Sequence, residues 1–286
     1  MLSLRERATP SDWLLLAYFA FGGLAIAVQR HRVDAWPTFL ILHAACVAVI
    51  LVMVAASERC PAMHAWYPIA MALVIFEEVA LLSFMFVGDW QDRHILAFES
   101  AVFPEPPTTW LSRFASPLVT EVLAMGYFSY YLMLPGVALV LYRRKDAGAF
   151  EDLMASGVVA YLICYVIFVA FPTEGPSHTL RHLHTDTFSG GPFWSMVALL
   201  QATAGVHGNA FPSAHAAGAV VALVFAWRYV RPLAVWMLGL VILMCVGAVY
   251  LRYHYASDML AGALVGVVIA CGYPRSPRRD GPPATA

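Results

Sequence analysis

Eight long apolar runs constrain this chain more than any other feature of its sequence. A helix of about 20 mainly apolar residues crosses the hydrocarbon core of a bilayer. The runs lie at Asp12–Gln29, Trp36–Ala56, Trp66–Val87, Pro117–Tyr142, Leu153–Phe171, Ser213–Val230, Pro232–Leu251 and Tyr255–Tyr273. We therefore predict an all-α fold, a polytopic membrane helix bundle with about eight transmembrane helices.

The composition agrees with this setting and excludes several functions. Apolar residues make up 61% of the chain and charged residues 12%, whereas about half of a soluble domain is apolar. The net charge is −1 and the basic residues are scattered, so no nucleic-acid partner is expected. The five cysteines form no C-x-x-C pair, which argues against a disulfide framework or a zinc site. We expect no metal and no cofactor.

The distribution of basic residues predicts the orientation in the membrane. With eight spans, both termini and 11 of the 17 Lys and Arg residues lie on one face. The other face carries Arg30, Arg32, Arg93, Arg113, Arg181 and Arg252. Because basic residues are enriched in cytoplasmic loops, we expect the termini in the cytoplasm. We expect the protein in the plasma (inner) membrane.

The chain divides into three predicted parts. Residues 1–60 form two N-terminal transmembrane helices, residues 61–273 form the membrane core, and residues 274–286 form a Pro- and Arg-rich cytoplasmic tail that is expected to be disordered. Between the spans, segments 88–116 and 172–210 combine polar and aromatic residues on one face. They form either a lid over a site or plain surface loops.

Two short polar stretches at helix mouths carry the candidate chemistry. The first is Phe211-Pro212-Ser213-Ala214-His215, and the second runs from Tyr250 to Asp258. The topology places both on the face opposite the termini, which the charge distribution predicts to be extracytoplasmic. Pro212 and Ser213 are expected to open the sixth helix, where backbone amides and the helix dipole favour a phosphate.

The histidines and the aspartate of these stretches have the spacing of a reactive group. His215 follows Ser213 by two residues and would lie above a phosphate bound at the start of this helix. His254 and Asp258 are four residues apart and share a helix face, so the carboxylate can accept a hydrogen bond from the imidazole. Such an arrangement suits an oriented nucleophile or base. The alternative for each histidine is a polar tip at the membrane interface without a catalytic role.

These residues resemble the signatures of a known family. Pro212-Ser213-Ala214-His215 resembles the P-S-x-H signature, and His254-x-x-x-Asp258 followed by Ala261-Gly262 resembles the H-x-x-x-D signature, of the type 2 phosphatidic acid phosphatase superfamily, which includes vanadium haloperoxidases. The resemblance covers about residues 89–272 and is closest to the branch of inositol phosphorylceramide synthases and related bacterial proteins. It implies a six-helix lipid-phosphatase-like core preceded by two further helices.

The resemblance also implies a mechanism. His254, held by Asp258, would attack phosphorus and form a phosphohistidine without a metal, while His215 would act as acid and then as base. Ser213 would hold phosphoryl oxygens. The substrate would be a phospholipid or another lipid phosphate. Water as acceptor gives a phosphatase and an alcohol gives a phosphotransferase, and both stay open. A different class of function also stays open, namely a catalytically silent member that binds or moves lipids.

The chain departs from the family at its cationic positions. The first signature of typical members is K-x6-R-P. If Pro172 is its proline, the expected Lys and Arg fall on Cys164 and Phe171. The Ser-Arg pair that normally begins the third signature, the one that ends in H-x-x-x-D, falls on Gly247-Ala248. A phosphate in transfer needs positive charge. Arg252 is the best substitute, with Arg181, His178 and His182 behind it. The alternative for Arg252 is an interfacial arginine that snorkels.

Polar residues inside the apolar runs remain to be placed. Glu77 and Glu78 lie within the third run, and adjacent helical residues diverge by about 100°, so at least one should face the bundle interior. We expect a structural contact between helices rather than headgroup binding. Tyr127, Tyr130 and Tyr131 are interpreted as packing residues.

Overall fold

The computed structural model describes residues 4–184, 187–204 and 208–273, and these residues form helices and no strand. The predicted all-α fold is confirmed, while the predicted disordered tail at residues 274–286 lies outside the described residues. The helices are α1 (Leu4–Arg7), α2 (Pro10–Val28), α3 (Trp36–Ala55), α4 (Pro61–Leu81), α5 (Asp92–Val102), α6 (Pro107–Ser112), α7 (Pro117–Arg143), α8 (Ala147–Ala170), α9 (Pro176–Thr179), the 3-10 turn η1 (Arg181–Leu183), α10 (Pro192–Ala204), α11 (Ala214–Tyr229), α12 (Arg231–Tyr250) and α13 (Ala256–Gly272).

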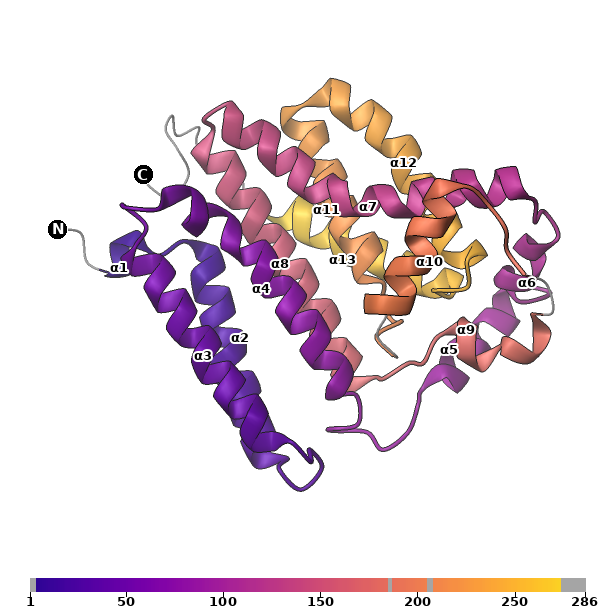
Figure 1. The fold of residues 1–286 in the computed structure, drawn as a ribbon, viewed down its shortest axis with the longest axis horizontal. Helices are drawn as coiled ribbons and strands as arrows, with labels where there is room; N and C mark the ends of the chain where they lie inside the picture. The colour runs from indigo at the N-terminus through magenta and orange to yellow at the C-terminus, as the bar shows by residue number, and fades with distance from the viewer. Residues whose placement is uncertain (1–3, 185–186, 205–207, 274–286) are drawn as a thin grey trace.

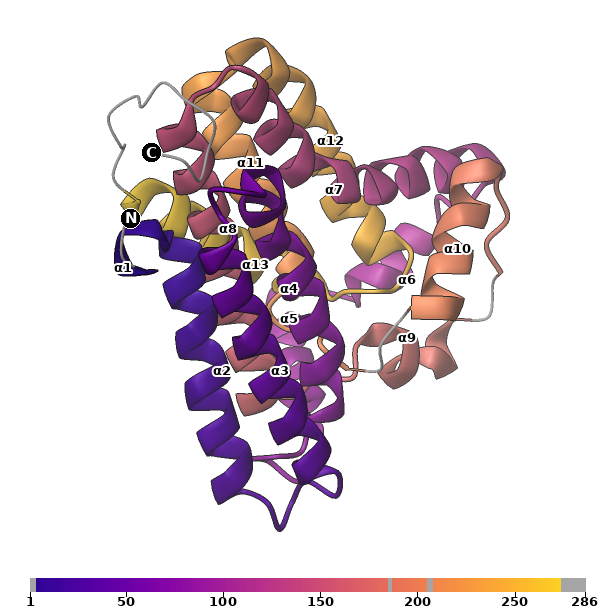
Figure 2. The same ribbon diagram turned by 60° about the vertical axis from the view of Figure 1, so that its left-hand side comes forward.

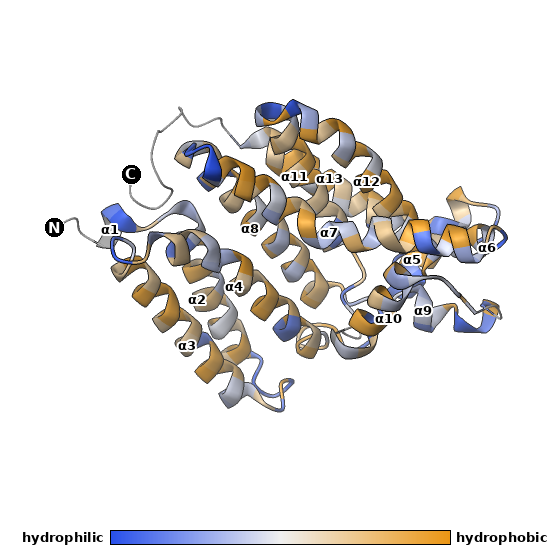
Figure 3. Ribbon diagram, turned by 45° about the horizontal axis from the view of Figure 1, so that its top comes forward, coloured by the Kyte–Doolittle hydropathy of each residue, from blue (hydrophilic) through white to orange (hydrophobic). Residues whose placement is uncertain are grey.

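Every predicted apolar run corresponds to a helix of the bundle. Six helices, α2, α3, α4, α7, α8 and α12, are long and apolar enough to cross a membrane. The other two are shorter, since α11 has 16 residues and α13 has 17. Apolar residues dominate along these helices, and hydrophilic residues gather at their ends and around α5, α6 and α9 (Figure 3). The chain is an integral membrane protein.

Two helices have boundaries that differ from the sequence prediction by several residues. The prediction began the third span at Trp66 and ended it at Val87, whereas α4 runs from Pro61 to Leu81. Proline favours the first turn of a helix, and the polar His64 in that turn is buried against Asp12 at 2.9 Å. Similarly, α8 begins at Ala147 rather than Leu153, because the Asp146 side chain accepts the Ala149 N–H and caps the helix.

The helices form two groups that meet at α8. Helices α2, α3 and α4 lie together at one side, and α2 and α4 contact α8 (Figure 1). In the second group, α11 packs between α8 and α13, and α12 packs against α7. The backbone of α13 touches the start of α11, since a Cβ at Gly262 would lie 2.1 Å from the Ser213 carbonyl oxygen. Only glycine allows this approach, which brings the two polar stretches together.

A buried carboxylate joins the N-terminal helices. Glu78 is buried and lies 2.5 Å from His43 Nε2, while Tyr18 donates to it at 3.4 Å. Glu77, by contrast, is exposed. The prediction that one of these residues faces the interior is confirmed, and its contacts link α4 to α2 and α3.

Apart from α1, the remaining short helices lie at the ends of α11 and α13 that carry the polar stretches. Helices α5 and α6 follow α4, and α9, η1 and α10 follow α8, so all five belong to one face (Figures 1 and 2). The Asp92 carboxylate on α5 accepts N–H groups of Glu174 at 2.7 Å and Gly175 at 2.9 Å, which joins the two segments. On the opposite face, Arg144 Nη1 donates to the Tyr229 carbonyl at 2.9 Å, so α7 and α11 end at the same level.

Candidate active site

Two histidines meet where α11 and α13 begin. His254 Nε2 lies 3.3 Å from His215 Nδ1 and 3.3 Å from Ser213 Oγ. Ser213 is the N-cap of α11, and its hydroxyl accepts the Ala216 N–H at 3.3 Å. Pro212 precedes this cap and is not part of the helix, so the expectation that Pro212 occupies its first turn is wrong. His254 likewise precedes the helix, since α13 begins at Ala256, so the expectation that His254 and Asp258 share a helix face is wrong.

The imidazole of His254 is oriented by acceptors on its other nitrogen. Nδ1 lies 2.9 Å from the Ala210 carbonyl oxygen and 3.4 Å from Asp258 Oδ2, which also accepts the Tyr255 N–H at 2.8 Å. Since both neighbours of Nδ1 accept, Nδ1 carries the proton and Nε2 presents a lone pair. Burial lowers the pKa of His254 to about 4, so the ring is neutral at pH 7.

The start of α11 offers donors to an anion. The Ser213 N–H donates to the Asp258 carbonyl at 3.0 Å, which ties the two polar stretches together. In the part of the chain that the structure describes, the amides of Ala214 and His215 have no protein acceptor. They belong to the first turn of the helix, where free N–H groups and the dipole favour negative charge.

The predicted cationic ligands lie at the edge of the site. The guanidinium of Arg252 stacks 4.3 Å above the Phe188 ring, and its Nη2 donates to Ser112 Oγ at 3.2 Å. Arg181 lies in η1 with an exposed side chain. The structure thus brings Ser213, His215, His254 and Asp258 together, and it places both arginines in the surrounding face.

Two carboxylates that the sequence interpretation missed support the second stretch. Asp92 accepts the Tyr255 hydroxyl at 2.9 Å, and Glu99 accepts the Ser257 N–H at 2.9 Å and its hydroxyl at 3.0 Å. Asp92 and Glu99 are seven residues apart and therefore share one face of α5. That spacing is the signal by which they were predictable from the sequence.

His215 has its own partners on its far side. Its Nε2 lies 3.2 Å from the Tyr127 hydroxyl, and its ring centroid lies 4.6 Å from that of Tyr130. Tyr127 was interpreted as a packing residue, and it does pack in the core, but it also contacts the site through its hydroxyl. No sequence signal marks this role, because Tyr127 lies in the middle of an apolar run.

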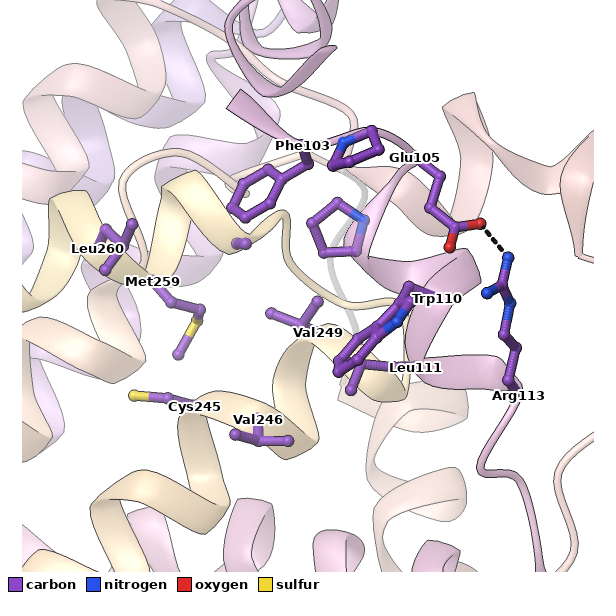
Figure 4. A pocket seen from close by; sticks show the side chains of 13 residues that line it. Phe103, Glu105, Trp110, Leu111, Arg113, Cys245, Val246, Val249, Met259 and Leu260 are labelled. Carbon is purple, nitrogen blue, oxygen red and sulfur yellow. Dashed lines mark hydrogen bonds and ion pairs between the residues drawn. The ribbon is translucent and has the colours of Figure 1, made fainter. Parts of the chain in front are cut away.

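An apolar cavity of about 690 Å³ flanks the second stretch. Figure 4 shows Phe103, Trp110 and Leu111 on one side of it and Val249, Met259 and Leu260 on the other. Met259 directly follows Asp258 in the chain. An ion pair between Glu105 and Arg113, at 2.7 Å, lies at its edge. The cavity therefore combines a wide apolar lining with a charged rim, and it reaches the second stretch at Ala256, while neither His215 nor His254 lines it.

No metal centre is formed by the residues in the described ranges. Among them, no group of three or more His, Cys, Asp or Glu side chains is placed to hold a metal ion.

Comparison with known proteins identifies the family. A family model described as the PAP2 superfamily matches residues 93–272, which run from α5 to the end of α13 and include both polar stretches. The chain belongs to the PAP2 superfamily. Members of this superfamily are in general phosphatases and phosphotransferases, and membership implies a lipid phosphate substrate in a membrane context. No curated protein and no solved structure gives a significant match.

Three positions at which the sequence resemblance expects cations are tightly packed. Cys164 is fully buried in α8, and Ala248 is fully buried in α12. A Cβ at Gly247 would lie 2.6 Å from the Leu123 carbonyl oxygen of α7. Close contact between helices leaves no room for a cationic side chain at these positions.

Proposed function

We propose that the protein transfers or hydrolyses a lipid phosphate ester without a metal, through a phosphohistidine at His254. The observation that carries this proposal is the geometry of His254, whose Nε2 lone pair faces His215 and Ser213 at 3.3 Å while Nδ1 is held by Ala210 and Asp258. This is the arrangement of an oriented nucleophile with an acid and base beside it.

The reaction would proceed in two balanced steps. First, His254 Nε2 forms a bond to phosphorus, the ester P–O bond breaks, and a protonated His215 gives its Nδ1 proton to the departing oxygen. Second, water or an alcohol attacks phosphorus and gives its proton to His215, and the N–P bond breaks. Asp258 stabilises the positive charge on the phosphorylated imidazole.

The phosphoryl oxygens need donors in both steps. We assign this role to the Ser213 hydroxyl, which lies 3.3 Å from His254 Nε2, and to the Ala214 and His215 amides that follow it at the start of α11. Arg252 is the proposed cation, because it lies two residues after the end of α12 and two residues before His254. Arg181 is the second candidate on the same face. Such preorganised donors stabilise the charge that develops on the oxygens.

The apolar cavity supports a lipid as the substrate. Its lining from the loop between α5 and α6, and from α6, α12 and α13, suits an acyl chain (Figure 4), and it adjoins the stretch that carries His254 at Ala256. Similarity to the inositol phosphorylceramide synthase branch favours transfer to a polyol or another alcohol over hydrolysis. Residues Tyr250–Tyr255 and Phe211–His215 carry that similarity.

One observation favours a second candidate function. The filled cation positions at Cys164 and Gly247-Ala248 would suit a catalytically silent member that binds or moves phospholipids.

Purified protein in detergent, given a panel of lipid phosphates with and without alcohol acceptors, separates the two candidates. We expect release or transfer of phosphate that survives chelators and is blocked by vanadate, which adopts the five-coordinate geometry of the transition state. Binding of lipid without turnover would favour the silent member, and activity that EDTA removes and Mg²⁺ restores would contradict the metal-free mechanism.

The excess of basic residues on the face of the termini supports a site on the extracytoplasmic side of the plasma (inner) membrane. Ser189 is an exposed residue of the segment that surrounds the site. A cysteine at this position should react with an impermeant thiol reagent added to intact cells. Reaction only after the membrane is opened would place the site on the cytoplasmic side.

A further inference from the structure

A chain of hydrogen-bonding side chains runs from α10 to the nucleophile. Gln201 Nε2 lies 3.2 Å from the Tyr127 hydroxyl, which lies 3.2 Å from His215 Nε2. On the other side of the same ring, His215 Nδ1 lies 3.3 Å from His254 Nε2. The two nitrogens of His215 therefore have different partners, and only Nδ1 faces the proposed reaction centre.

The direction of each hydrogen bond follows from its two ends. His254 Nε2 can only accept, because Nδ1 holds the proton between Ala210 and Asp258, so a neutral His215 donates to it from Nδ1. His215 Nε2 is then an acceptor, and the Tyr127 hydroxyl donates to it. An amide nitrogen only donates, so Gln201 occupies a lone pair of the Tyr127 oxygen and leaves the hydroxyl proton for His215 Nε2.

Packing prevents the His215 ring from exchanging its two nitrogens. Tyr130 and Tyr127 lie against it with centroid distances of 4.6 Å and 5.4 Å. Tyr127 is itself only 1% exposed and also contacts the Tyr253 ring. A ring turn at His215 would need these aromatic side chains to separate.

The helix that carries Gln201 is fixed to the helix that carries Tyr127. The Glu121 carboxylate on α7 accepts the N–H groups of Gly191 at 2.7 Å, Phe193 at 2.8 Å and Trp194 at 3.1 Å. These amides lie at the N-terminal end of α10, where a carboxylate is favourable. Gln201 therefore approaches Tyr127 from a helix whose position α7 itself determines.

We infer that Tyr127, oriented by Gln201, is a positioning residue that fixes which nitrogen of His215 faces His254 and keeps the resting proton on that nitrogen. The inference rests on the proposed function and names a further part of its machinery. When His215 takes a second proton as the acid, the Tyr127 hydroxyl turns and accepts from Nε2–H, since it has a second lone pair. One hydroxyl thus serves both protonation states of His215.

The test combines turnover with NMR of ¹⁵N-histidine-labelled protein in detergent. Tyr127→Phe should lower kcat by about tenfold or more with an unchanged KM, because it misplaces an acid and base without touching lipid. Gln201→Glu supplies an acceptor in place of the donor. The Tyr127 hydroxyl should then donate to the new carboxylate instead of to His215, and the His215 proton should move to Nε2. Tyr131→Phe, which removes an exposed hydroxyl of the same helix, is the matched control and should behave as wild type.

The NMR measurement requires no substrate, so its result does not depend on the assay of lipid turnover. The wild type should show a protonated Nδ1 and an unprotonated Nε2 on His215, assigned by their loss in His215→Asn, and Tyr127→Phe should shift the Nε2 resonance. A protonated Nε2 in the resting wild type, or unchanged His215 resonances and kcat in Tyr127→Phe, would overturn the inference. Gln201→Leu provides the same comparison if Tyr127→Phe does not fold. The expected NMR spectra in a protein that turns over no lipid phosphate would reject the proposed function alone.

Discussion

Substitution of His254 with alanine should abolish phosphoryl transfer, with a loss of at least about four orders of magnitude, because the proposed reaction needs the His254 Nε2 lone pair to form the bond to phosphorus. Phosphate release from the best lipid phosphate of the panel measures the loss. Brief reaction with labelled substrate should also trap an acid-labile phosphoenzyme in the wild type and none in His254→Ala.

Two variants calibrate this result. His94→Ala removes an exposed histidine of α5 and should leave turnover unchanged. Asp258→Asn should cause a partial loss, since the Ala210 carbonyl at 2.9 Å still orients Nδ1 while the compensating charge is gone. A His254→Ala protein that is folded and retains turnover within about tenfold of wild type would rule out the phosphohistidine.

Substitution of Arg252 with alanine should lower turnover by about a hundredfold, the typical cost of removing one preorganised transition-state contact. The expected loss is large because Cys164 and Gly247-Ala248 replace the usual cations. Arg252→Lys should rescue only in part, since lysine lacks the planar fork that matches a phosphate. Initial rates at saturating lipid, with detergent gel filtration as the fold check, measure both variants.

Arg252 also contacts Ser112 and Phe188, so its loss could lower turnover by disturbing the local structure. A control is needed for that structural role. The double variant Ser112→Ala, Phe188→Leu removes both described contacts of the guanidinium and keeps the charge. If Arg252 binds phosphate, this variant should stay within a few-fold of wild type. An equal loss in the double variant and in Arg252→Ala would show that the arginine acts as an anchor, and Arg181 would become the leading cation.

The parts of this fold that depend on local pattern were predictable from the sequence. Apolar length located the six long helices and the shorter α11 and α13, and the spacing of His254 and Asp258 and the cap at Ser213 located the residues of the site. Boundaries failed where a polar residue has a distant partner. The first turn of α4 buries the polar His64 because Asp12, 52 residues away, binds it, and no local pattern contains that information.

The supporting groups of the site were not predictable for the same reason. Ala210 contributes a carbonyl oxygen, which every residue has, and its importance comes only from the position of His254. Tyr127 and Gln201 lie on α7 and α10, and only tertiary packing brings them to His215. Asp92 and Glu99 did carry a signal in their spacing of seven, but their partners in the second stretch belong to another part of the chain.

The unequal lengths of α7 and α11 bear on how long a phosphoenzyme would survive. The two helices end level at Arg144 and Tyr229, yet α7 has 27 residues and α11 has 16. At about 1.5 Å per residue, the histidines therefore lie about 16 Å below the far end of α7. His254 is 4% exposed, so a phosphoryl group on it would be enclosed by the protein while it waits for its acceptor. Its lifetime would then depend on which molecules can reach it, and the choice between water and an alcohol becomes a competition of access rather than of reactivity.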